Sequence, residues 1–226
     1  MLYSYMIRQT AYLLTLTAML ASCQEAPHAD KAKVSEAKTV KVGEGHAYLA
    51  DTATSIIGWI GTKPTGKHHG ILKVHSGVIY IKDTTITAAE FVIDMHTLQN
   101  VDLASDTAMK NKLESELKGP LFFDTGKFPI ASFEMTAIEP FKPTLDEDVT
   151  LKDATHRIQG NFTIRGVTKN ISFPAVINIT SGKVTAEASF NIDRTLWGIN
   201  YRADKSLQDK LINSQVNISF SITAIR

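Results

Sequence analysis

GNFTIRGVTKNISFP, residues 160–174, alternates apolar and polar side chains on both sides of a central glycine. Phe162 and Ile164 share one face before Gly166, and Phe173 continues an apolar face after it. Such alternation is typical of antiparallel strands with one buried and one solvated side. Glycine gives the backbone the freedom that a tight connection needs. The stretch therefore predicts a strand pair that neighbouring strands extend into a sheet.

The same two-residue period recurs through most of the chain that follows His46. One buried and one solvated face are typical of antiparallel sheets, and closure into a barrel removes the exposed edges. We therefore predict an all-β fold with one covering helix, built as an antiparallel β-barrel of about eight strands. The predicted strands cover residues 47–51, 54–65, 70–82, 86–95, 130–138, 156–164, 171–179, 183–192 and 215–225.

The covering helix is predicted where the period changes after Ser105. Met109, Leu113 and Leu117 recur at four-residue spacing, which places them on one face of a helix, and Ser105 or Asp106 is the expected N-terminal cap. A loop over 139–153 and a short helix over 206–212 complete the prediction.

Residues 1–22 have the features of a bacterial lipoprotein signal peptide. Arg8 supplies a positive charge, and the apolar run over residues 11–20 is shorter than the ~20 residues that a membrane span needs. LASC, residues 20–23, resembles a lipobox, in which cleavage precedes a cysteine that is then lipidated. We predict export and lipid attachment at Cys23, with anchoring in the bacterial cell envelope. A plain signal peptide is the alternative.

Composition indicates one globular domain behind a tether. The chain has 226 residues, a formal net charge of +1 and 43% hydrophobic residues, which suits a single core and gives no basic footprint for nucleic acid. Cys23 is the only cysteine, so we expect no disulfide. Residues 23–45 are rich in Ala, Lys and Glu and predict a flexible spacer, and residues 46–226 form the predicted domain.

Several strings of the domain, in order, resemble the YceI-like family of secreted polyisoprenoid-binding proteins. The resemblance covers residues 46–226 and implies a lipocalin-like antiparallel barrel that holds a long apolar lipid, with no established catalysis. It rests on YLADTATSIIGW at 48–59, HHG at 68–70, FVIDMHTL at 91–98, FFDTGKFPIASFE at 122–134, FTIRGVTKNISFP at 162–174 and FNIDRTLWGI at 190–199.

The predicted apolar faces mix small alanines with large aromatic residues. From the residues alone, this mixture leaves open a compact core and a hollow with aromatic walls; the family resemblance favours the hollow. Each CH₂ group buried there would contribute about 0.8 kcal/mol, so an isoprenoid chain could bind without a strong polar contact. The predicted wall residues are Trp59, Phe91, Phe133, Met135, Phe162, Phe173, Phe190, Trp197 and Phe220.

Two polar residues are candidates for the mouth of the barrel. Arg194 could hold a phosphate or carbonyl oxygen of the ligand, or it could pair with Asp193 or Asp94 and only stabilise the barrel end. His69 could meet a ligand head group. No Cys, Asp or Glu completes a metal-binding spacing with it and its neighbouring histidines, so we predict no metal site and no cofactor other than a bound isoprenoid-type lipid.

Four Asn-X-Ser/Thr sequences occur in the second half of the chain, at Asn161, Asn170, Asn178 and Asn217. Their polar–apolar–polar pattern is also that of an alternating strand. We therefore interpret them as ordinary strand residues rather than glycosylation sites.

The sequence favours binding, sequestration or transport of an isoprenoid or isoprenoid quinone. A second possibility is a filled barrel that binds another envelope protein through its loops, including residues 139–153. An enzyme is the third and least favoured class, because no nucleophile–base pair is recognisable. The expected partners are the lipid and a membrane, reached through the anchor; a homodimer stays open.

Overall fold

Arg165 and Gly166 form the turn between β8 (His156–Ile164) and β9 (Val167–Thr180) in the computed structural model. Both residues have positive φ angles, of 52° and 74°, as in a type I′ hairpin turn. β8 and β9 pair antiparallel without interruption from the turn down to His156. The predicted strand pair is therefore the hairpin from which the sheet extends.

The structure describes residues 26–143 and 149–226, with the backbone alone at residues 208–210. The predicted signal peptide and Cys23 lie outside these ranges. The remaining elements are β1 (Asp30–Lys31), β2 (Lys33–Ser35), β3 (His46–Ala50), β4 (Ile56–Lys63), β5 (Gly66–Lys82), β6 (Thr85–Asn100), α1 (Thr107–Lys118), β7 (Ile130–Pro140), β10 (Lys183–Asp193), β11 (Gln215–Ile225) and the 3₁₀ helices η1 (Arg194–Trp197) and η2 (Lys205–Lys210).

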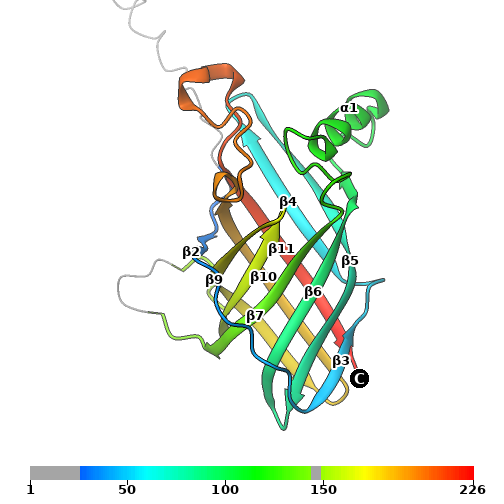
Figure 1. The fold of residues 1–226 in the computed structure, drawn as a ribbon, viewed down its shortest axis with the longest axis vertical. Helices are drawn as coiled ribbons and strands as arrows, with labels where there is room; N and C mark the ends of the chain where they lie inside the picture. The colour runs from blue at the N-terminus through cyan, green and yellow to red at the C-terminus, as the bar shows by residue number, and fades with distance from the viewer. Residues whose placement is uncertain (1–25, 144–148) are drawn as a thin grey trace, which may run out of the picture.

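The long strands close into a barrel (Figure 1). Each strand from β5 to β11 pairs antiparallel with the next, and β11 pairs back with β3 and β4, which both pair with β5. Because β3 and β4 act as one interrupted strand, the wall is a closed eight-stranded antiparallel barrel. The predicted fold class is confirmed.

The predicted strand boundaries differ most at β6, which continues to Asn100 rather than ending at Met95. Its last residues include His96, Thr97 and Gln99, which interrupt the apolar alternation, yet Gln99 and Asn100 still pair with β5. Backbone pairing therefore extends the strand beyond the residues that its side chains indicate. The predicted short helix over 206–212 is the 3₁₀ helix η2.

Helix α1 lies at one end of the barrel (Figure 1). It is capped by Asp106, whose carboxylate accepts a hydrogen bond from the Met109 amide at 3.0 Å. None of its residues is buried, and Met109 is 51% exposed. Only Leu113 and Leu117 of the predicted apolar face point at the barrel interior. Within the described part of the chain, no helix is long and apolar enough to cross a membrane.

Residues 26–38 form an N-terminal strap on the barrel wall, where the sequence predicts a flexible spacer. β9 and β10 pair with each other only over residues 176–180 and 183–187. Beyond that point β1 pairs parallel with β10, and β2 pairs antiparallel with β9. The strap thus lies in the gap between the two strands, with Ala32 and Val34 against the core. For residues 30–35 the prediction of an undocked spacer is wrong.

Polar side chains on the outer barrel surface hold the strap. Asn161 exchanges two hydrogen bonds with the backbone of Lys38, at 2.9 and 2.6 Å, and Asn191 donates to the Pro27 carbonyl oxygen at 2.9 Å. Asn170 and Asn217 are buried in the same region. Three of the four Asn-X-Ser/Thr asparagines are therefore covered strand residues, and only Asn178 is exposed.

Candidate functional site

The barrel interior holds a cavity of about 410 Å³, lined by side chains of strands β4 to β11 and of α1. This volume lies in the range of roughly 300–1,000 Å³ that is common for ligand sites. The interior is therefore hollow, and the alternative of a completely filled barrel does not hold.

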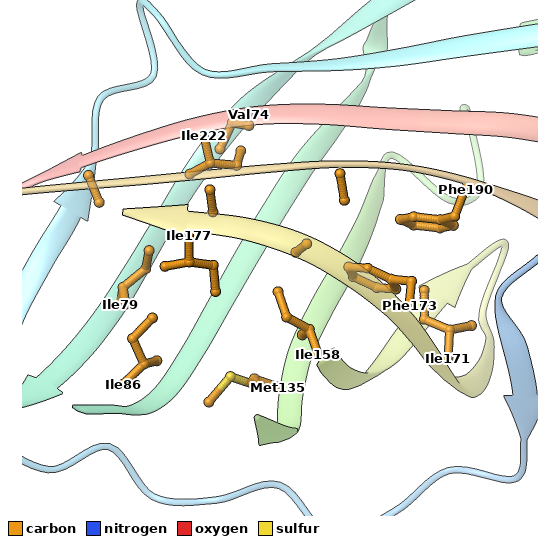
Figure 2. Packing of buried hydrophobic residues seen from close by; sticks show 14 of the residues in the cluster. Val74, Ile79, Ile86, Met135, Ile158, Ile171, Phe173, Ile177, Phe190 and Ile222 are labelled. Carbon is orange, nitrogen blue, oxygen red and sulfur yellow. The ribbon is translucent and has the colours of Figure 1, made fainter. Parts of the chain in front are cut away.

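Aromatic rings form one continuous side of this cavity. Phe173 of β9 stacks on Phe190 of β10 with 4.2 Å between ring centroids (Figure 2). Phe220 of β11 meets Phe173 edge-on at 5.8 Å, and Phe133 of β7 lies tilted to it at 6.0 Å. Because each ring contacts another in a favourable offset or edge geometry, the rings support one another along this side of the cavity.

The two ends of the barrel differ in polarity. Tyr48, Ile81, Val184 and Ala224 are buried at the end away from α1, and none of them lines the cavity. The cavity is therefore closed there, above a floor of aliphatic side chains that gather between the strands (Figure 2). The floor residues are Ile79, Ile86, Ile158, Ile177 and Ile222.

Charged and polar side chains line the opposite end, next to α1. Lys63 and His68 come from the β4–β5 hairpin, Glu116 comes from α1, and Arg202 comes from the segment after η1. We call this the open end. The cavity thus changes from apolar at the closed end to polar at the open end. This arrangement suits a molecule whose apolar tail lies on the floor and whose polar head lies at the open end.

Asp102 ties α1 to the open end. Its carboxylate accepts hydrogen bonds from the His69 amide at 2.8 Å and from Asn100 Nδ2 at 2.6 Å, and it lies 2.8 Å from His68 Nδ1. Burial acts to raise the pKa of Asp102, but these hydrogen bonds outweigh it and hold the pKa below its ordinary value. Glu114 of α1 accepts from the Asn100 amide at 2.8 Å, so strand and helix share one network.

Arg194 is the buried cation of the site, only 5% exposed. Its Nε donates to the Asn213 carbonyl oxygen at 3.1 Å, and its Nη2 donates to those of Tyr201 and Ile212 at 2.9 and 2.8 Å. Nη1 donates to the Ile199 carbonyl oxygen. The guanidinium group therefore holds the loop between η1 and β11 against the barrel while it lines the cavity.

Neither of the ion pairs considered for Arg194 forms as a salt bridge in the described residues. Asp193 instead caps η1, accepting from the Thr195 amide at 3.0 Å and from its hydroxyl at 2.6 Å. Asp94 accepts from the His96 amide. Burial lowers the pKa of Arg194, and the charge of Asp193 only partly opposes this.

The structure places nine of the eleven predicted site residues on the cavity wall: Trp59, Phe91, Phe133, Met135, Phe162, Phe173, Phe190, Arg194 and Phe220. Trp197 lies behind the wall, completely buried, and its Nε1 donates to the Phe162 carbonyl oxygen at 3.0 Å. His69 is not among the lining residues, and its Nδ1 lies 3.6 Å from Asp102 Oδ1; its neighbour His68 lines the cavity instead. No group of three His, Cys, Asp or Glu residues in the described chain could hold a metal ion.

Sequence reasoning missed the aliphatic floor and the loop residues of the open end. The floor isoleucines lie on the apolar faces of the predicted strands, so strand parity could have identified them. Phe122, Phe123 and Ile212 also line the cavity, but they belong to irregular segments whose sequence carries no periodic signal.

Two polar atoms of β4 at the open end are buried without a hydrogen-bond partner among the described residues: Trp59 Nε1 and Thr62 Oγ1. The Trp59 ring lies over Gly70, where a Cβ atom would come within 2.6 Å of it. Buried polar groups are rarely left unpaired, so these are wall groups whose hydrogen-bonding capacity is unused.

Comparison with known proteins identifies the barrel. A family model described as the YceI-like domain matches residues 48–224. The structure of BcnA from Burkholderia cenocepacia is similar, with a TM-score of 0.60, 18% identity, and coverage of 77% of this chain and 99% of that one. A polyisoprenoid binding domain from Saccharophagus degradans, implicated in plant cell wall breakdown, has a TM-score of 0.56 and 14% identity, with coverage of 79% and 97%. No curated protein matches the chain. With most of its length matched by that model, the chain belongs to the family of YceI-like domain proteins.

Proposed function

We propose that this protein binds a long apolar lipid, an isoprenoid or isoprenoid quinone, with the tail on the isoleucine floor and the head at the open end. The observation that carries the proposal is the hollow, aromatic-walled cavity, closed at one end and polar at the other. The similar domain from Saccharophagus degradans, described as polyisoprenoid binding, supports the choice of ligand class. The role is binding, sequestration or transport rather than catalysis.

The energetics suit such a ligand. Ten buried CH₂ groups would contribute about 8 kcal/mol before the cost of association is subtracted. The unused donors Trp59 Nε1 and Thr62 Oγ1 near the open end are compatible with a head that carries a neutral oxygen acceptor. We place the protein in the bacterial cell envelope, exported and held to a membrane by a lipid on Cys23.

The direct test is mass spectrometry of the purified mature protein, first under native conditions and then after extraction with organic solvent. We expect a mass above that of the lipidated chain, and an isoprenoid-type lipid in the extract. A protein that stays empty after exposure to isoprenoid quinones would contradict the proposal.

A cavity-filling variant links the lipid to the barrel interior. Ala89 lines the cavity, so Ala89→Trp fills part of it, and we expect at least a several-fold loss of recovered lipid. Ala47 is an exposed residue of β3. Ala47→Trp is therefore the matched control, and lipid recovery should be unchanged. Equal recovery from both variants would mean that the lipid binds elsewhere.

A further inference from the structure

An apolar rim surrounds the open end of the barrel. It consists of large hydrophobic side chains that are each more than a third exposed and come from separate segments. These segments are held together: Arg165 donates to the carbonyl oxygens of Pro120, at 2.8 Å, and Gly198, at 3.3 Å, and the rings of Phe122 and Tyr201 meet at 5.4 Å. The rim residues are Val101, Met109, Leu121, Leu196 and Leu207.

Basic residues accompany the rim. Lys112 and Lys118 lie on α1 and Lys205 on η2, as rim residues do, and Lys63 lies at the β4–β5 hairpin of the open end. In the part of the chain that the structure describes, none of these lysines forms a salt bridge. Apolar side chains flanked by lysines are typical of surfaces that rest on the interface of an anionic membrane.

Exposed apolar residues alone do not show which end of the barrel faces a membrane. Leu49 and Ile225 are neighbours at the closed end and are as exposed as the rim residues. The attachment of the strap decides between the two ends. Pro27 is bonded to Asn191, two residues before the end of β10 at the open end. The β10 residue at the closed end is Lys183.

The length of chain before Pro27 sets the reach of a lipid on Cys23. Four residues span at most about 14 Å when fully extended. Along β10, Lys183 lies eight residues beyond Asn191, or roughly 26 Å at the ordinary strand rise. A lipid attached to Cys23 can therefore reach the level at which β10 ends beside the open end, whereas the level of Lys183 at the closed end lies beyond its reach.

We propose that the open end of the barrel docks on the surface of the lipid bilayer, with the rim in the interface and the cavity opening onto the membrane. This inference rests on the proposed anchor at Cys23 and deepens the proposed lipid-binding function. A bound lipid would then enter and leave without exposing its tail to water.

Site-directed spin labelling of the lipidated mature chain tests this orientation, since its only native cysteine carries the predicted lipid. The protein is reconstituted in vesicles of phosphatidylcholine and phosphatidylglycerol with single substitutions Met109→Cys or Leu121→Cys at the rim, and Leu49→Cys or Ile225→Cys as closed-end controls. We expect rim labels to be accessible to oxygen and shielded from a water-soluble nickel chelate, and control labels to show the opposite. Water-exposed labels at both ends, or shielded labels only at the closed end, would overturn the proposal.

Sedimentation with the same vesicles measures the rim without the anchor. The mature chain, residues 23–226, with Cys23→Ser should bind measurably, and less at high salt. Met109→Asp with Leu121→Asp should weaken this binding several-fold, and Leu49→Asp with Ile225→Asp should leave it unchanged. Equal weakening by both pairs, or no binding before the rim is changed, would count against a docking rim.

The two proposals can fail separately. An empty cavity by mass spectrometry with protected rim labels contradicts the lipid-binding function and leaves docking in place. Recovered lipid with both ends in water contradicts docking alone.

Discussion

Arg194 shows how a single residue organises the open end. Its guanidinium group donates to four backbone carbonyl oxygens on a loop that has no regular structure of its own except η2. The sequence places Arg194 at the barrel mouth but cannot identify its partners, because backbone carbonyls up to 19 residues away leave no pattern in side chains. Trp197 of η1 also has a backbone partner that the sequence does not reveal, because its Nε1 donates to the Phe162 carbonyl oxygen of β8.

We predict that Arg194→Met destabilises the fold by at least ~3 kcal/mol, because several buried carbonyl groups lose their donors at once. Urea unfolding measures the loss, and hydrogen exchange should show the loop over 198–213 opening. Arg226→Met, at the exposed chain end, is the control and should stay within ~0.5 kcal/mol of the parent. A comparable, small change in both variants would show that Arg194 does not hold the loop.

At the scale of elements, the alternation of apolar and polar side chains predicts the long strands of the barrel but does not predict the strap. The alternation in residues 160–174 gives the β8–β9 hairpin, with Gly166 in its turn. β1 and β2 are two and three residues long, too short for any period to be recognised. Their positions depend on Asn161 and Asn191, which form hydrogen bonds with Lys38 and Pro27 across sequence separations of 123 and 164 residues.

Asn161→Ala should release the strap. We expect a loss of about 1–3 kcal/mol in the free energy of unfolding, because the variant removes both hydrogen bonds to Lys38 and leaves Asn170 without one partner. Hydrogen exchange should accelerate in residues 30–38 before the rest of the barrel. Asn178→Ala, in the same Asn-X-Ser/Thr setting but exposed, should change stability by no more than ~0.5 kcal/mol; equal effects would argue against strap docking through Asn161.

At the scale of the whole molecule, the sequence predicts a closed antiparallel barrel, but it does not predict whether the barrel contains a cavity. Alternation identifies which side chains point inward, but a packed core and a hollow use the same parity. The difference lies in how side chains such as Phe173 and Phe190 stack across strands and leave space beside them. For this chain, the family resemblance was needed to favour the hollow.

Removal of the proposed lipid should lower the melting temperature of the protein, because a ligand that binds only the folded state stabilises it by mass action. We expect delipidated protein to recover the lost stability when an isoprenoid quinone is added, and far less recovery in Ala89→Trp, whose cavity is partly filled. Differential scanning calorimetry measures the melting temperatures of the lipid-bound protein, the delipidated protein and the Ala89→Trp variant, the last two with and without added quinone. Identical melting temperatures with and without lipid would indicate that nothing binds the barrel interior.

β9 and β10 separate beyond residues 176 and 187, and the strap fills the part of the barrel wall between them. Asp30 pairs with Phe190 and Val34 with Ile171, so the strap contacts residues that lie well over a hundred positions later in the chain. Closing a loop of this length costs entropy before the contact is made, so such contacts are slow to form. We therefore expect the strap to be among the last segments to dock, and a recombinant domain started at the boundary of the family match would carry an open seam beside its stacked phenylalanines.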